Sequence, residues 1–276
     1  MSLLSGAVQP PLLTLLSSTS TPPLSLFAVS THDQHLDGDS IVTVLLDSAP
    51  ASSSRVPHRP ARGQLVDQVI HIQSPVITNT YIEAGVSPSA SQARKGKSRA
   101  SDEDMQMPLG VEMPWFGMQF RRLGKRPFAF ELGVADKKGR EGVIRISSFK
   151  HRPTIHPSRT PPLIHLPLNL PDATSSTLTP WLTTSMDLAS LLPLFQTLLK
   201  VRLEEEEEDE EEGRRRKRRK AAELPSGQFG HVTYVRIYAN CRLRRIWLSA
   251  EGERTTSGMG IGVQQEWGLY ACSTET

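Results

Sequence analysis

The sequence predicts an all-β domain, either a closed barrel or a sandwich of two sheets. Apolar and polar residues alternate in many short runs, as they do in strands with one buried face. Proline and glycine, of which the chain has 21 and 19, mark turns between these runs. The length of 276 residues suits one or two domains.

The clearest pair of strands lies in the middle of the chain. Residues 127–134 place phenylalanine, leucine and valine at every second position, and residues 142–149 repeat the pattern with Ile144 and Ile146 in phase. The polar segment Asp-Lys-Lys-Gly at 136–139 separates the two runs. Two alternating runs around a polar turn that contains glycine predict a β-hairpin.

Seven further runs are interpreted as strands: 40–47, 65–73, 76–83, 115–123, 163–170, 231–239 and 242–249. In the last run bases and apolar residues share both faces, so its alternation is not clean. Residues 186–203 are rich in leucine, with Asp187 as a candidate N-cap and Pro193 as an interruption. This segment predicts a strand that runs into one short helix.

Three segments contain few apolar residues and predict disordered insertions: 48–63, 87–107 and 204–228. Each is short enough to be a surface loop, so the chain is interpreted as a single β-domain. Its core segments are 7–47, 64–86, 108–203 and 229–270.

The net charge of +3 conceals two opposed runs. Residues 204–212 are nine consecutive acids, and seven consecutive bases follow at 214–220. Outside these runs 25 bases and 20 acids remain, a net charge of +5. The basic run is either a solvated loop or a nuclear import signal, and the adjacent acids weigh against direct binding to nucleic acid. Its residues are Arg214, Arg215, Arg216, Lys217, Arg218, Arg219 and Lys220.

Several classes of protein do not fit the sequence. No apolar run approaches 18 residues, and no base precedes Arg55, so a membrane span, a secretory signal and a mitochondrial signal are not expected. Two cysteines do not make a disulfide framework, and the eight histidines lack zinc-binding spacing. The glycines at 258–262 lack the Lys-Ser/Thr of a phosphate loop and predict a flexible turn.

No set of residues forms a recognisable active site, so the sequence predicts no enzyme, no cofactor, no metal and no small-molecule substrate. Arg242, Arg244 and Arg245 would lower the pKa of the Cys241 thiol, but a small buried residue is the preferred interpretation. For the four tryptophans, core packing is preferred to stacking on bases or sugars.

The segment Tyr-Ala-Asn-Cys-Arg-Leu-Arg-Arg-Ile-Trp-Leu-Ser at 238–249 is distinctive. It resembles a block near the end of the cilia- and flagella-associated protein 20 family. Its motif residues are Ala239, Asn240, Cys241 and Arg242. Segments that resemble the rest of the family follow in the same order: 78–82, 109–114, 128–132, 162–170, 181–195 and, as a terminal strand, 266–270.

The resemblance implies a jelly-roll β-sandwich without enzymatic activity, associated with the doublet microtubules of cilia and also with a nuclear role in RNA processing or transcription. Tubulin or microtubule-associated proteins would then be the partners, in the cytoskeleton, the nucleus or, in a ciliated host, the cilium. The chain departs from the family in its three insertions and in Tyr238, where the family usually has histidine.

Two basic groups are the candidate contact residues for an acidic surface such as tubulin or nucleic acid. They are Arg242, Arg244 and Arg245, and Arg121, Arg122, Lys125 and Arg126. A nuclear protein that uses 214–220 for import is the second hypothesis. A carbohydrate-binding module is the third, by analogy of fold alone.

Overall fold

The computed structural model describes residues 9–31, 39–47, 65–87, 107–171, 179–205, 224–225 and 227–270. The predicted insertion 48–63 lies wholly outside these ranges, and 87–107 and 204–228 lie mostly outside them. The basic run 214–220 and Cys272 are also outside, so the predictions made for them stay predictions.

The described residues form thirteen strands. Their bounds are β1 Leu12–Ser17, β2 Ala28–Thr31, β3 Ile41–Leu46, β4 Gln68–Gln73, β5 Thr80–Gly85, β6 Trp115–Arg122, β7 Ala129–Asp136, β8 Glu141–Ser147, β9 Thr154–His156, β10 Leu163–Pro167, β11 Leu182–Asp187, β12 Phe229–Tyr238 and β13 Cys241–Ser249. Helices occur at α2 Leu188–Leu191, α3 Leu194–Glu205, α5 Glu253–Ser257 and α6 Ile261–Trp267.

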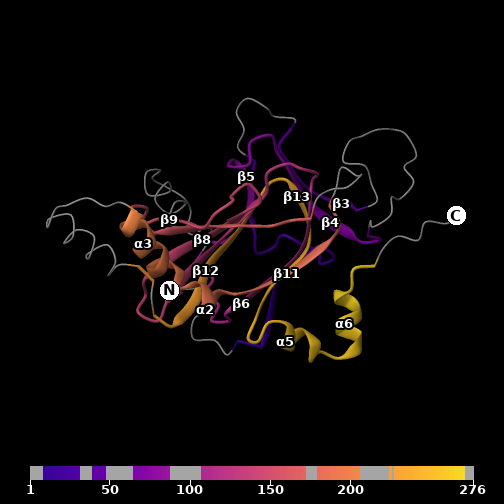
Figure 1. Cartoon of the computed structure of the whole chain (residues 1–276). Coiled ribbons are helices and arrows are strands. Elements are labelled where there is room, and N and C mark those ends of the chain that lie inside the picture. The colour runs from indigo at the N-terminus through magenta and orange to yellow at the C-terminus, as the bar shows by residue number, and fades with distance from the viewer. Residues whose placement is uncertain are drawn as a thin grey trace, which may run out of the picture.

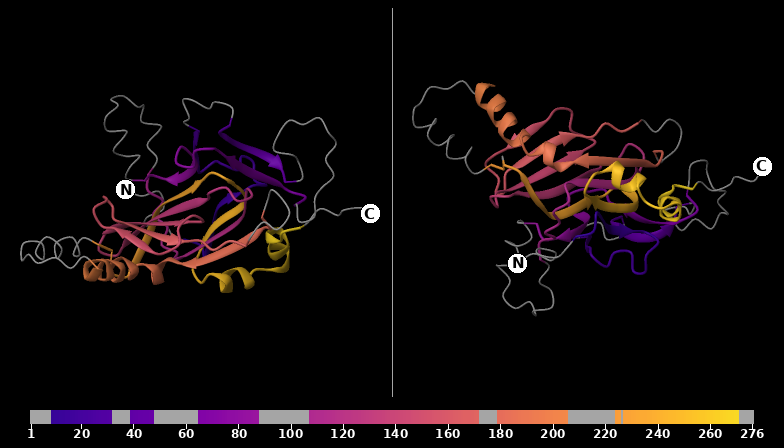
Figure 2. Two further views of the ribbon diagram at one scale, coloured as in Figure 1. Left: turned by 45° about the horizontal axis from the view of Figure 1, so that its top comes forward. Right: turned by 90° about the horizontal axis from the view of Figure 1, so that it is seen from below.

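The strands make two sheets, which Figures 1 and 2 show as the body of the molecule. Sheet A has the order β11-β6-β13-β4-β3, with β1 also paired to β13. Sheet B has the order β2-β5-β12-β7-β8-β10-β9. The all-β sandwich that the sequence predicts is therefore confirmed.

One apolar cluster fills the space between the sheets. Phe116 of β6 stacks on Phe130 of β7 with ring centroids 5.7 Å apart, and Phe120 stacks on Phe128 at 5.0 Å. All four rings are fully buried or nearly so. Phe116, Phe120 and Phe130 lie at in-phase positions of their strands, and Phe128 continues this phase just before β7, which is why the alternation found them.

The predicted hairpin is confirmed, since β7 and β8 pair antiparallel from Ala129↔Ser147 to Ala135↔Glu141. At its turn the Asp136 carboxylate accepts hydrogen bonds from the Lys138 and Arg140 amides, at 2.9 and 3.0 Å. An aspartate that binds its own turn backbone in this way stabilises a short connection.

The predicted transition from strand to helix is confirmed, but two helices follow the strand instead of one short helix. Strand β11 ends at Asp187, whose side chain caps α2 by accepting a hydrogen bond from the Ala189 amide at 3.0 Å. Pro193 then separates α2 from α3. Helix α3 lies next to β9 (Figure 1), and its Arg202 donates a hydrogen bond to the Ile155 carbonyl of that strand.

A β-bulge explains why residues 242–249 do not alternate cleanly. The register of β13 against β6 shifts between Leu243 and Arg245. Leu243, Ile246 and Leu248 consequently face the core, while Arg245 and Trp247 face outward. One extra residue in a strand reverses the phase of everything after it.

Two expectations near the C-terminal end are wrong. Residues 266–270, which resemble a terminal strand, begin within helix α6 and continue without strand pairing. Gly260 is the N-cap of α6 and Gly262 lies inside it, so only the first part of 258–262 is a turn. The apolar N-terminal segment forms β1 and β2, which the alternation does not predict.

Candidate functional site

The family-like motif forms the corner where the chain crosses from sheet B to sheet A. Ala239 and Asn240 connect β12 to β13, and both are buried. The Asn240 backbone has a φ of 108°, and its side chain accepts a hydrogen bond from the Ser74 amide and donates one to the Pro127 carbonyl. Asparagine suits this corner because it tolerates positive φ and satisfies two backbone groups.

A polar cleft of about 390 Å³ opens beside this corner. The exposed side chains of Asp39 and Arg126 line it, together with Pro127. The rest of its lining is Gln73, Ser74, Pro75 and Asn240. Lys125, next to Arg126 in the β6–β7 connection, is exposed as well.

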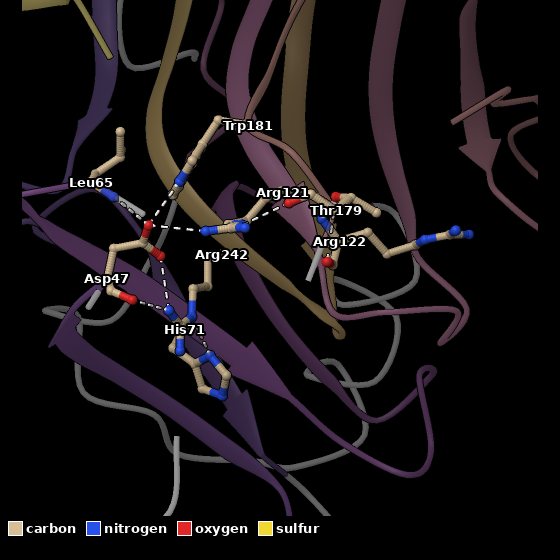
Figure 3. Close-up of polar contacts among 8 residues, drawn as sticks. All are labelled: Asp47, Leu65, His71, Arg121, Arg122, Thr179, Trp181 and Arg242. Carbon is tan, nitrogen blue, oxygen red and sulfur yellow. Dashed lines mark hydrogen bonds and ion pairs between the residues drawn. The ribbon is translucent and has the colours of Figure 1, made fainter. Parts of the chain in front are cut away.

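Arg242 and Arg121 meet at a single buried carboxylate, that of Asp47 (Figure 3). The Asp47 oxygens lie 2.8 Å from Arg242 Nη1 and 3.1 Å from Arg121 Nη1. The Leu65 amide (2.7 Å) and the Trp181 indole NH (2.9 Å) also donate to Asp47. Asp47 follows β3, so this contact joins three strands of sheet A that are remote in sequence.

His71 lies against the same cluster, with its Nδ1 3.4 Å from Arg242 Nε. Burial, and then the positive charge of Arg242, lower the pKa of His71 to about 4. The ring is therefore neutral at pH 7, and a neutral imidazole can accept the hydrogen bond that the guanidinium donates.

Arg244 and Arg245 lie further along the outer face of sheet A. Arg244 pairs with Asp67 at 2.9 Å, and Arg245 pairs with Glu266 at 3.0 Å. The indole of Trp267 also covers the Arg245 guanidinium, 4.6 Å from the ring centroid. The C-terminal segment thus lies over this part of the sheet, as Figures 1 and 2 show for α5 and α6.

Five of the seven candidate contact residues are buried in the structure. Arg121, Arg122, Arg242, Arg244 and Arg245 are all at least 91% buried. Four of them pair with carboxylates from other segments. The fifth, Arg122, donates a hydrogen bond from its backbone amide to Thr179, and its side chain points away from the Asp47 cluster (Figure 3). Only Lys125 and Arg126 remain exposed.

The outer face of sheet B holds a row of alternating charges that sequence reasoning missed. Glu83, Arg236, Glu131, Arg145 and His165 stand directly opposite one another on β5, β12, β7, β8 and β10. Glu83 pairs with Arg236, and Glu131 pairs with both arginines. The sequence does contain a pattern that could have predicted this row, because these charged residues occupy the polar positions of alternating strands.

Tyrosines complete this row. The Arg236 guanidinium lies 4.4 Å from the ring centroid of Tyr81 and 5.8 Å from those of Tyr234 and Tyr238. Burial, and then the charge of Glu131, raise the pKa of Tyr238 to about 12. The row is internally neutralised, so it stabilises the sheet rather than presenting free charge.

Cys241 is fully buried, and burial raises the pKa of its thiol. This agrees with the interpretation of Cys241 as a small buried residue and not as a reactive thiol. The tryptophans meet the expectation of core packing only in part, and none belongs to the central core cluster. Trp247 is buried on the outer face of sheet A, whereas Trp115, Trp181 and Trp267 are half-buried.

No group of three or more metal-ligating side chains occurs among the described residues. The helices in the described ranges are also too short or too polar to cross a bilayer.

Comparison with protein families gives a match over half of the chain. A family model described as the CFA20 domain matches residues 59–197, which is 139 of the 276 residues. The matched region ends within α3, so it stops before the strands that contain the motif corner. The search of curated proteins found no match.

Proposed function

The chain belongs to the CFA20 domain family, and from this membership we propose that it is a non-enzymatic scaffold that binds proteins of microtubules or axonemes. The family is not known as one of enzymes. The buried charged groups support a non-enzymatic role, because they form ion pairs with one another within the sheets. A contact that forms without rearrangement of the fold instead needs residues that are already exposed.

The exposed bases at the β6–β7 connection are the best candidate for the contact. Lys125 and Arg126 stand beside the 390 Å³ cleft at the motif corner. The hydrogen bonds of Asn240 to Ser74 and Pro127 hold this corner in place. An acidic protein surface would be attracted by this pair and would meet a concave, polar cleft next to it. This juxtaposition is the single observation on which the proposed contact rests.

Co-sedimentation of the full chain with microtubules tests the proposal. The variant Lys125→Glu/Arg126→Glu should pellet about tenfold more weakly, since two reversed contacts at about 0.7 kcal/mol each make a tenfold change. The control Lys137→Glu/Lys138→Glu reverses two exposed bases at the β7–β8 turn and should bind like the parent. Equal binding by the first variant and the parent would exclude this contact.

Reversing Arg244 and Arg245 to glutamate is not a useful test. Both side chains are buried, and the new carboxylates would lie beside Asp67 and Glu266. The sheet would lose stability, so lost binding would not identify a contact.

A nuclear role is the second candidate, favoured by the seven consecutive bases at 214–220. In this role the chain would engage RNA-processing or transcription machinery. Deleting 214–220 from a tagged full chain should reduce its nuclear fraction. An unchanged nuclear fraction would remove the import signal, and absence of both forms from the nucleus would remove the nuclear role.

The carbohydrate-binding alternative gains no support from the tryptophans. Trp181 donates to Asp47, and Trp267 packs on Arg245. A sugar-binding module needs an exposed aromatic platform, and these indoles are engaged by the protein itself.

A further inference from the structure

The C-terminal segment 251–270 presents two consecutive residues to the arginines on sheet A. The Glu266 carboxylate lies 3.0 Å from Arg245 Nη2, and the Glu266 carbonyl lies 3.5 Å from Nη2 atoms of both Arg244 and Arg245. The Trp267 carbonyl accepts a hydrogen bond from Gln119 Nε2 at 2.9 Å.

The Trp267 indole is held on two sides. One is the Arg245 guanidinium, and the other is the Trp247 ring, which it meets edge-on with centroids 4.7 Å apart. Arginine against an indole face, and one aromatic edge against another, are both favourable arrangements. The surface beneath the segment therefore contacts a glutamate and the aromatic residue that follows it. We call this surface the arginine–tryptophan site; it consists of Gln119, Arg244, Arg245 and Trp247.

The segment is weakly attached to this site. Neither α5 nor α6 buries a residue, and the Glu266 side chain is 62% exposed. Ile261 is 75% exposed, so the apolar residues of α6 add little burial. A segment with few buried contacts opens at low cost compared with unfolding of the sheets.

The segment also satisfies the site incompletely. The Nε atoms of Arg244 and Arg245, and Oε1 of Gln119, are buried and lack a hydrogen-bond partner among the described residues. Glu266 meets Arg245 through Nη2 alone, whereas a carboxylate can bind Nε and Nη2 of one guanidinium together. A ligand with better placed acceptors would therefore bind more tightly than Glu266 does.

We propose that the arginine–tryptophan site binds an acidic–aromatic segment of a partner protein, and that Glu266 and Trp267 occupy it within the chain until such a segment displaces them. This proposal rests on the scaffold function proposed above and names a partner's chemistry. It also gives the buried arginines of the motif region a role in recognition, because displacement of the segment exposes them.

A labelled peptide with the sequence of residues 260–270 is the probe, and fluorescence anisotropy with the full chain is the measurement. The variant Glu266→Gln/Trp267→Ala should bind the peptide at least tenfold more tightly than the parent, because its own segment competes poorly. Ile261→Ser alters an exposed residue of the same helix and should bind like the parent. A peptide with glutamine and alanine in place of its glutamate and tryptophan should not bind.

The proposal fails if the double variant melts like the parent but binds the peptide no more tightly. It also fails if the altered peptide binds as well as the original. Should the double variant not fold, hydrogen exchange of the parent decides: excess peptide should raise the exchange of amides in 259–270, and unchanged exchange would overturn the proposal.

These outcomes are separate from the microtubule test. Peptide binding as expected, without co-sedimentation of the parent or the double variant, would support the site and reject the microtubule role. Co-sedimentation of the parent with microtubules, together with no binding of the peptide by either protein, would reject the site and leave the scaffold function standing.

Discussion

Asp47 joins several segments on the outer face of sheet A. Its carboxylate is fully buried and holds two guanidinium groups, an indole NH and a backbone amide. Buried charges are tolerated only when they are paired and hydrogen-bonded. Asp47 therefore determines whether Arg121 and Arg242 can lie inside the protein.

Replacing Asp47 with asparagine should destabilise the fold by about 3–5 kcal/mol. The size of the side chain is kept, but the two buried arginines lose their counter-charge. Urea denaturation would measure the change. Glu141→Gln, which neutralises an exposed carboxylate at the start of β8, should shift the free energy of unfolding by less than about 0.5 kcal/mol. Equal stability of the two variants would contradict the role given to Asp47.

His71 should make the protein sensitive to acid. Burial and Arg242 hold its pKa at about 4 in the folded state, against about 6.5 in an unfolded chain. The unfolded state therefore binds the proton first, and the contribution of His71 to stability is complete above pH 6.5 and falls as the pH drops towards 4. Between pH 7 and 4.5 the loss should be about 2 kcal/mol.

The variant His71→Gln isolates this effect, since its amide oxygen can still accept from Arg242 but does not titrate. Urea unfolding of both proteins at pH 7 and 4.5 gives the comparison. The parent should lose about 2 kcal/mol more than the variant over this interval. The same loss in both would assign the acid sensitivity to other groups.

At the scale of elements, the turn between β12 and β13 decides the architecture. These two consecutive strands do not form a hairpin, because the Asn240 corner sends them into different sheets. The corner is fixed by a positive φ and by hydrogen bonds to Ser74 and Pro127.

Two substitutions at Asn240 separate these contributions. Glycine accepts the φ of 108° but leaves the Ser74 amide unpaired, so Asn240→Gly should cost about 1–3 kcal/mol. Asn240→Ala loses the same bonds and adds backbone strain, so it should cost about 1 kcal/mol more. Chemical denaturation distinguishes them. If alanine and glycine are equally destabilising, positive φ is not important at this corner.

At the scale of the whole molecule, the family match and the folding unit do not coincide. The match ends at residue 197, yet β12 and β13 lie in the middle of sheets B and A. β12 pairs with β5 and β7, and β13 pairs with β1, β4 and β6. A single domain that includes the C-terminal strands is therefore the expected unit of folding.

Truncation tests this expectation. A chain that ends at residue 205 lacks an interior strand of each sheet and should not fold. A chain that ends at 258 retains all thirteen strands and loses only α6 and the residues beyond it, so it should melt cooperatively like the full chain. Circular dichroism during heating is the measurement. A cooperative transition in the shorter chain would show that β12 and β13 are dispensable.

Much of the sandwich could be predicted from local pattern. Alternation found both strands of the β7–β8 hairpin, and Asp187 followed by leucines marked the start of α2. At β13 the pattern predicted the strand but not the bulge that shifts its phase. It failed at α6, a short helix without a buried face. Periodicity records which residues share a face, but a bulge depends on the partner strand.

The sequence by itself determined the β-class of the fold, the hairpin, the capped helix and the family, whose model matches residues 59–197. Only the tertiary structure decided whether the arginines are buried and which carboxylates they pair with. Asp47, Asp67 and Glu266 are remote in sequence from most of the bases that they neutralise, and the fold brings them onto one face. Alternation tells which side of a strand a charge takes, but whether that side is covered depends on segments that the strand meets only after folding.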